Sequence, residues 1–153
     1  GLGDVYKRQP WLTQLYTRLI CDEFYGITPE HGYGYGQDED QGQLGAWYVM
    51  AAMGLFDVQG GTNITPSYQI GSPKFRKITI QLDPRYYSGK TFVIETENNA
   101  PNHYYIQSAT LNGKPLEDCW FYRREMLNGG HLKLHMDAHP NTRWGVSSIP
   151  HSK

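Results

Sequence analysis

The hydrophobic periodicity of this chain changes once, and the change divides it into a helical part and a β-rich part. From Trp11 onwards the apolar residues recur at helical spacing, whereas after Gly60 and Gly61 they alternate with polar residues at a period of two. The sequence therefore predicts an α+β protein in which helices precede strands.

Two helices are predicted in the first part. The first covers about 10–24 and has Pro10 at a first-turn position, where a missing N–H costs nothing. Its apolar stripe consists of Leu12, Leu15, Tyr16, Leu19, Ile20 and Phe24. The second covers about 41–53, with Asp40 and Gln43 spaced as a capping box and Gly54 as its C-terminal stop. Because two helices cannot cover their own apolar surface, they are predicted to belong to a larger helical body.

The second part is predicted to form an antiparallel, sandwich-like β lobe. Period-two alternation marks strands around 78–80, 92–94, 104–111 and 132–134. Turn signals separate these segments, at Ser88-Gly89, Asn98-Asn99-Ala100-Pro101, Asn112-Gly113 and Asn128-Gly129-Gly130.

Charge and hydropathy exclude several classes of function. The chain has 14 Lys and Arg against 15 Asp and Glu, without a long run of like charge, which argues against a nucleic-acid backbone binder or a polybasic membrane anchor. No apolar run approaches the roughly 20 residues that span a bilayer. Residues 1–9 have neither periodicity nor a cap and are predicted to be a non-native leader.

Cysteines and histidines give little chemical signal. Cys21 and Cys119 form no metal or redox motif and are predicted to be buried free thiols, with a disulfide as the alternative. His131, His135 and His139 lie four residues apart on a predicted strand, where that spacing separates them by roughly 13 Å. They are therefore predicted to be surface residues and not ligands of one metal ion.

The densest chemical signal is the acidic triplet Asp38-Glu39-Asp40, between a Gly- and Tyr-rich loop over 25–37 and the second helix. Two interpretations stay open: the carboxylates could cap the helix, or one could be a general base kept ionised by the helix N-terminus. A cation site is a third, weaker alternative, because two carboxylates supply few of the oxygen ligands that calcium needs. In an inverting glycosidase the acid and base carboxyls lie about 6.5–9.5 Å apart, so the acid would come from elsewhere.

The triplet opens a longer stretch that resembles a known family. Residues 38–49 read DEDQGQLGAWYV and are similar to the signature (Asn/Asp)-(Asp/Glu)-Asp-x-Gly-Gln-Met-Ser-Ala-Trp-Tyr-Val of glycoside hydrolase family 92, the exo-acting α-mannosidases. The segments at 10–14, 22–26, 68–75, 105–115 and 129–132 also resemble that family, in order and with short gaps.

The resemblance implies a fold and a site. The chain would supply the terminal helices of an (α/α)₆ toroid catalytic domain over 10–60 and a C-terminal β-rich region over 61–150. It implies inverting, Ca²⁺-dependent hydrolysis of terminal α-mannosides, with Asp40 as the first choice for the general base and Asp38 as the second. Gln43, Tyr35 and Trp47 would shape the substrate pocket, the metal ligands stay unassigned, and the general acid would lie upstream.

The resemblance also implies partners and a location. The partners would be a mannose-containing glycan and the upstream remainder of the same polypeptide, and the enzyme would be periplasmic, secreted or at the cell surface. The 153-residue chain alone is expected to be inactive, because it lacks one of the two carboxyl groups. Two alternatives remain: a non-catalytic carbohydrate-binding β-sandwich, and another (α/α)₆ glycosidase acting on a different sugar.

Overall fold

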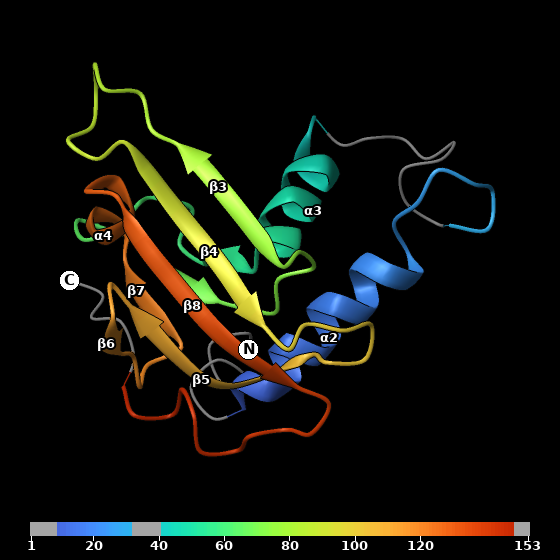
Figure 1. Cartoon of the computed structure of the whole chain (residues 1–153). Helices are drawn as coiled ribbons and strands as arrows, with labels where there is room; N and C mark the ends of the chain where they lie inside the picture. Colours follow the sequence, from blue (N-terminus) through green and yellow to red (C-terminus); the bar gives the residue numbers. More distant parts are fainter. Residues whose placement is uncertain (1–8, 32–40, 149–153) are drawn as a thin grey trace.

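A computed structural model describes residues 9–31 and 41–148 of the protein (Figure 1). Two longer helices come first, α2 (Pro10–Glu23) and α3 (Gln43–Met53). The strands and a short helix follow in the order β1 (Leu55–Phe56), β2 (Ser67–Ile70), β3 (Lys77–Gln81), β4 (Thr91–Glu97), β5 (Tyr105–Leu111), β6 (Lys114–Pro115), β7 (Trp120–Tyr122), α4 (Arg123–Leu127) and β8 (Gly130–Asp137). The predicted α+β class, with helices before strands, is confirmed.

The strands form two sheets: the smaller was not predicted from the sequence, and one strand pair of the larger runs in a direction that differs from the prediction. The smaller has the order β1-β2-β7 and is antiparallel, whereas the larger has the order β3-β4-β8-β5-β6. In the larger sheet β8 lies between β4 and β5 and runs parallel to β4. The prediction of a purely antiparallel lobe is therefore wrong at this pair, because the long connection from β4 to β8 lets the chain return in the same direction.

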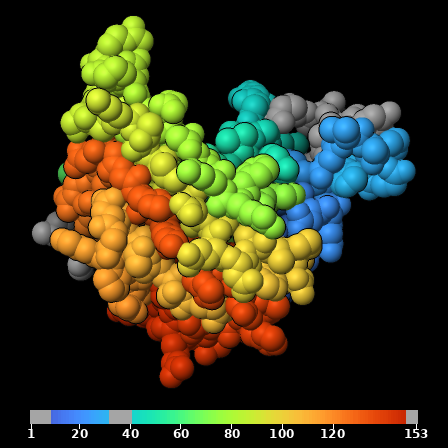
Figure 2. Space-filling model, in the orientation of Figure 1, coloured from blue at the N-terminus to red at the C-terminus, as the bar shows by residue number. Residues whose placement is uncertain are grey.

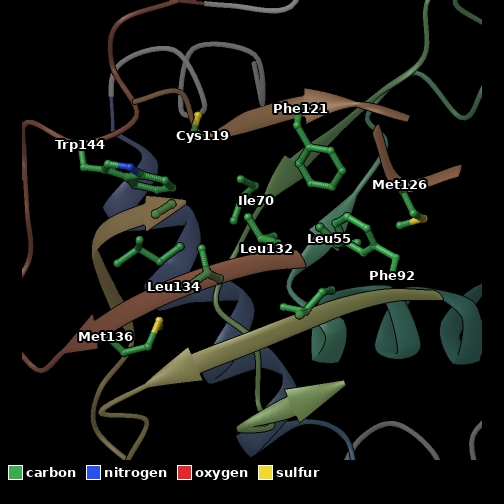
Figure 3. Packing of buried hydrophobic residues seen from close by; sticks show 13 residues of the cluster. Leu55, Ile70, Phe92, Cys119, Phe121, Met126, Leu132, Leu134, Met136 and Trp144 are labelled. Carbon is green, nitrogen blue, oxygen red and sulfur yellow. The ribbon is translucent and has the colours of Figure 1, made fainter. Parts of the chain in front are cut away.

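The inner faces of the two sheets share one hydrophobic core (Figure 3). The large sheet contributes alternate residues of its central strands, as the period-two pattern predicts. Leu132, Leu134 and Met136 of β8 are fully buried, and so are Phe92 and Ile94 of β4. The small sheet covers them from the other side with Leu55, Ile70 and Phe121.

The turn between β5 and β6 has the geometry that its sequence predicts. Asn112 and Gly113 both adopt positive φ, 52° and 77°, as the central pair of a tight hairpin requires. The connection between β3 and β4 is longer and projects from the body of the molecule (Figure 2). Tyr86 in this projection is 74% exposed.

Helix α2 packs on the β lobe through its polar face. Pro10, Thr13, Gln14, Arg18 and Cys21 are buried, whereas most of the apolar stripe is only half-buried. Tyr16 and Phe24 of that stripe are exposed. The helix itself is confirmed, but its apolar side is not the side that meets the strands.

Cysteines and histidines behave as predicted. Cys21 and Cys119 are buried free thiols. His131 and His135 of β8 are partly exposed beside carboxylates of β4, with His131 Nε2 3.1 Å from a Glu95 oxygen. Within residues 9–31 and 41–148, no helix is long and apolar enough to cross a bilayer.

Candidate active site

The proposed catalytic carboxylates lie outside the described part of the chain. Asp38, Asp40 and Tyr35 fall within residues 32–40, which the structure does not describe. Gln43 and Trp47 are described, and both lie on α3. Helix α3 is thus the described element that follows the acidic triplet most directly in the chain.

The N-terminus of α3 differs from the predicted capping box. The helix begins at Gln43, after Gly42 as N-cap with a φ of 82°, and this glycine has no side chain with which to cap the helix. Gln43 is therefore the first helical residue and not the third, so α3 starts two residues later than the pattern indicated. Asp40, the other member of the predicted capping box, lies outside the described residues. The side chain of Gln43 is exposed.

Trp47 lines an apolar groove between α2, α3 and β1. The groove has a volume of about 400 Å³. Its lining is mainly apolar and consists of Thr13, Tyr16, Thr17, Ile20, Trp47, Ala51, Gly54, Leu55, Phe56, Val58 and Gly71. Such a lining offers few hydrogen-bond partners, so the groove fits apolar side chains better than a hydroxyl-rich sugar.

A buried arginine fastens α2 to the loop between β2 and β3. The Arg18 guanidinium donates to the carbonyl of Pro73 at 2.7 Å and to Ser72 Oγ at 3.4 Å. It also lies over the ring of Tyr104, 5.3 Å from the centroid. These contacts fix the position of the C-terminal half of α2, which leads into the loop that precedes the acidic triplet.

Lys74 links the same loop to both helices. Its ammonium group lies 2.6 Å from a carboxylate oxygen of Asp22 on α2 and 5.7 Å from the ring centroid of Tyr48 on α3. Partial burial lowers the pKa of Lys74, but the hydrogen bond and the charge of Asp22 outweigh burial, and the pKa lies above its usual value. Lys74 is therefore held as a cation between the helices.

The described residues do not by themselves form a calcium site. Among them, no three His, Cys, Asp or Glu side chains are close enough together to hold a metal ion. Calcium requires six to eight oxygen ligands, and the sequence places its acidic triplet in residues 38–40, outside this part.

The sequence pattern did not indicate the polar residues that hold α2 against the β lobe. Arg18 and Gln14 lie on the buried side of α2 with Pro10 and Cys21, at spacings of three and four residues. This second helical stripe is visible in the sequence, but its polar members made it look like a solvent-facing side. Tyr25 contacts α3, since its hydroxyl donates to the Leu44 carbonyl at 3.1 Å and its ring stacks on Trp47, but no local pattern in the sequence indicates these contacts.

Comparisons with known proteins agree with the resemblance. A model described as the glycosyl hydrolase family 92 catalytic domain matches residues 5–138. An uncharacterized secreted glycosidase of Arthroderma benhamiae is 34% identical over 115 residues, which are 74% of this chain and 14% of that protein.

Two solved structures from Bacteroides thetaiotaomicron are also similar. A family GH92 inverting mannosidase is 39% identical with a TM-score of 0.77, and the match covers 94% of this chain and 18% of that one. A family GH92 α-mannosidase in complex with mannoimidazole is 28% identical with a TM-score of 0.83, and the match covers 97% of this chain and 19% of that one.

The chain thus spans about a fifth, or less, of the length of these relatives. The family model nevertheless covers most of the chain, including the signature stretch and the strands up to the end of β8. On this ground, the chain belongs to glycosyl hydrolase family 92.

Proposed function

We propose that the protein containing this chain is an inverting exo-α-mannosidase that removes terminal α-mannose from glycans. The observation that carries the proposal is the 39% identity, over 94% of the chain, to a protein described as an inverting mannosidase. The signature stretch over 38–49 lies inside the family match and holds the acidic triplet. The activity belongs to the longer polypeptide and not to the 153 residues alone.

In this proposal Asp40 is the general base, with Asp38 as the second choice. The base takes a proton from a water molecule, which attacks the anomeric carbon while a carboxylic acid protonates the departing oxygen. The two groups must lie about 6.5–9.5 Å apart to leave room for that water, so neighbouring triplet residues cannot fill both roles. The general acid therefore comes from another part of the polypeptide.

Further roles are proposed for the residues around the base. Gln43 is exposed at the first position of α3, three residues after Asp40, where its amide can hydrogen-bond a sugar hydroxyl. Tyr35 is proposed to contact the sugar. Trp47 is proposed to shape one wall of the substrate pocket from the side of the apolar groove. Calcium dependence follows from the resemblance to the family, and its ligands stay unassigned.

The upstream remainder of the polypeptide is the proposed partner of the α2–α3 surface. Helix α3 is apolar on nearly all sides, yet only Ala51 and Ala52 are buried along its length. A helix of that kind is normally enclosed by protein. The open apolar stripe of α2 and the groove beside Trp47 fit the helices that would complete an (α/α)₆ toroid. The division into a toroid part over 10–60 and a β-rich region over 61–150 is part of this proposal.

One observation argues against a carbohydrate-binding sandwich as the main function. Strands β3, β4 and β8 lie wholly within the described part, and their outward positions carry no Trp, Tyr or Phe. They carry charged and polar residues such as Glu95, Glu97 and Lys133. Sugar-binding sheet faces use exposed aromatic rings, so this face is a poor sugar platform.

A secreted or periplasmic location is proposed from the relative that is named a secreted glycosidase.

The test uses the full-length protein. Release of mannose from an α-mannoside is measured with and without a chelator for wild type, Asp40→Asn and Asp38→Asn, with Glu23→Gln on the exposed side of α2 as the control. We expect Asp40→Asn to lose about 10²–10⁴-fold in kcat while mannoimidazole binding and Tm are retained, because a general base contributes that much. Full activity in Asp40→Asn and Asp38→Asn would refute the base assignment, and unchanged activity in chelator would refute the calcium requirement.

A further inference from the structure

A polar cavity lies at the edge of the large sheet, where β6 covers only one end of β5. Strand β6 pairs with Thr110 and Leu111, and the rest of this edge of β5 meets residues 115–117 and 141–144. The cavity between these three segments has a volume of about 330 Å³. Its polar lining consists of Gln107, Ser108, Thr110, Glu117, Asn141 and Arg143.

Backbone hydrogen bonds hold the three walls of the cavity in place. The Asn141 side chain donates to the carbonyl of Gln107 at 2.9 Å and accepts the backbone N–H of Arg143 at 2.9 Å. The backbone N–H of Gly145 donates to the carbonyl of Glu117 at 3.1 Å. The side chains on the rim are therefore carried by segments whose relative positions are already fixed, which lowers the cost of ordering them around a ligand.

An indole ring forms the apolar part of the cavity. Trp144 lines it and is 5% exposed, as a member of the hydrophobic core (Figure 3). Its Nε1 donates to the carbonyl of Leu116 at 2.9 Å, so its polar atom is already satisfied. The cavity thus combines an apolar surface with a polar rim, as ligand sites commonly do.

Four polar side chains on the rim are available to a ligand. Within residues 9–31 and 41–148, the side chains of Ser108, Thr110, Glu117 and Arg143 have no hydrogen-bond or ion-pair partner. A β-bulge at 106–108 interrupts the pairing of β5 with β8 beside Ser108, and bulges often re-aim side chains next to functional sites. The rim therefore offers two hydroxyls, one carboxylate and one guanidinium.

We propose that this cavity binds one neutral pyranose unit. A carboxylate accepts hydrogen bonds and a guanidinium only donates them, so together they match hydroxyl groups, which do both. Their charges cancel, so the rim favours neither an anion nor a cation. The ring of Trp144 provides an apolar surface for the C–H groups of a sugar. The inference does not rest on the proposed hydrolysis, because none of these residues has a role in it.

The test is hydrogen exchange of the full-length protein during titration with D-mannose, which contains no glycosidic bond to hydrolyse. We expect residues 105–117 and 137–145 to become protected with roughly millimolar affinity, because one sugar ring gains little more than that from a shallow site. Glu117→Gln and Arg143→Gln should each weaken binding by about tenfold or more, since a hydrogen bond to a charged group contributes about that much. Both positions are exposed, so Tm should stay unchanged.

The control is Arg85→Gln in the β3–β4 projection, whose guanidinium pairs with Asp83 and not with the cavity. This variant should bind mannose as wild type does. A sulfur-linked mannobiose, which resists hydrolysis, distinguishes a glycan chain from free sugar: tighter binding than mannose supports the site with a glycan unit as its ligand, and equal binding supports it with a single sugar.

Three results would overturn the inference. They are an absence of protection by mannose in both segments, equal affinity in Arg143→Gln and Arg85→Gln, and protection by the zwitterion L-alanine without protection by mannose. Mannose release from an α-mannoside is measured on the same samples. A protein that releases no mannose but shows the expected protection refutes the proposed function and supports the pyranose site.

Discussion

The side chain of Gln14 on α2 satisfies a backbone group of the β lobe. Gln14 is 1% exposed, and its Oε1 accepts a hydrogen bond from the backbone N–H of Ile106 on β5 at 2.9 Å. Ile106 is itself 1% exposed, so water cannot take the place of the Gln14 oxygen as the acceptor for its N–H. The amide therefore depends on a residue 92 positions away in the chain.

Replacing Gln14 by Met isolates the value of this hydrogen bond. Met has nearly the same length and volume as Gln, so the substitution removes the acceptor without opening a large cavity. A buried N–H left without a partner costs about 1–3 kcal/mol. With an m-value of about 1–3 kcal/mol per molar urea for a small protein, the unfolding midpoint should fall by about 1 M.

Urea unfolding of the 153-residue chain, followed by circular dichroism, measures the effect. The control is Glu23→Ala, at an exposed position of the same helix, which should change the free energy of unfolding by no more than about 0.5 kcal/mol. Equal midpoints for Gln14→Met and wild type would refute the reasoning, because the contact between Gln14 and Ile106 would then contribute nothing to stability.

Three further predictions concern thiols, charge and packing. Burial raises the pKa of the Cys21 and Cys119 thiols to about 11, so both should react slowly with a thiol reagent at pH 8 and rapidly in denaturant; rapid reaction in the native state would contradict this. The hydrogen bond from Lys133 holds the pKa of Glu97 below its usual value, so the pair stabilises the fold above the ordinary carboxyl pKa and loses that effect as the pH falls through the lowered value. The urea midpoint of Glu97→Gln should accordingly depend less on acid pH than that of wild type, and identical profiles would count against the pair. Gly89→Ala should cost about 1–3 kcal/mol or more in urea unfolding, because the new Cβ would overlap the backbone of the turn before β8; a neutral effect would contradict that close contact.

Local pattern was sufficient for the two longer helices and for the main strands of the large sheet, whereas the small sheet β1-β2-β7 and helix α4 were not predicted. Helical spacing predicted α2 to within one residue at its end, and Gly54 stops α3 in the left-handed conformation that the sequence indicates. Alternation placed Phe92 and Leu132 on the buried face of the large sheet. These features depend on residues close together in the chain, so a reader of the sequence can recover them.

The candidate site was only partly predictable. The acidic triplet is visible because three carboxylates follow a Gly- and Tyr-rich loop and precede a helix, and the sequence also placed Gln43 and Trp47 on that helix. The start of α3 was predicted two residues too early, because a capping box pattern does not show whether its hydrogen bonds form. The contact of Tyr25 with α3 was missed, since nothing local indicates which aromatic rings meet.

The sequence by itself determined the two longer helices, the alternating strands of the large sheet and the resemblance to family 92. It favoured buried free thiols for Cys21 and Cys119, which the structure confirms. Only the tertiary structure decided that β8 runs parallel to β4, that α2 buries its polar side, and that Tyr25 holds the first turns of α3. The physical reason is that a buried polar group is stable only when a partner meets it. For Gln14 that partner is a backbone amide far along the chain, and periodicity, which describes neighbours in sequence, carries no information about it.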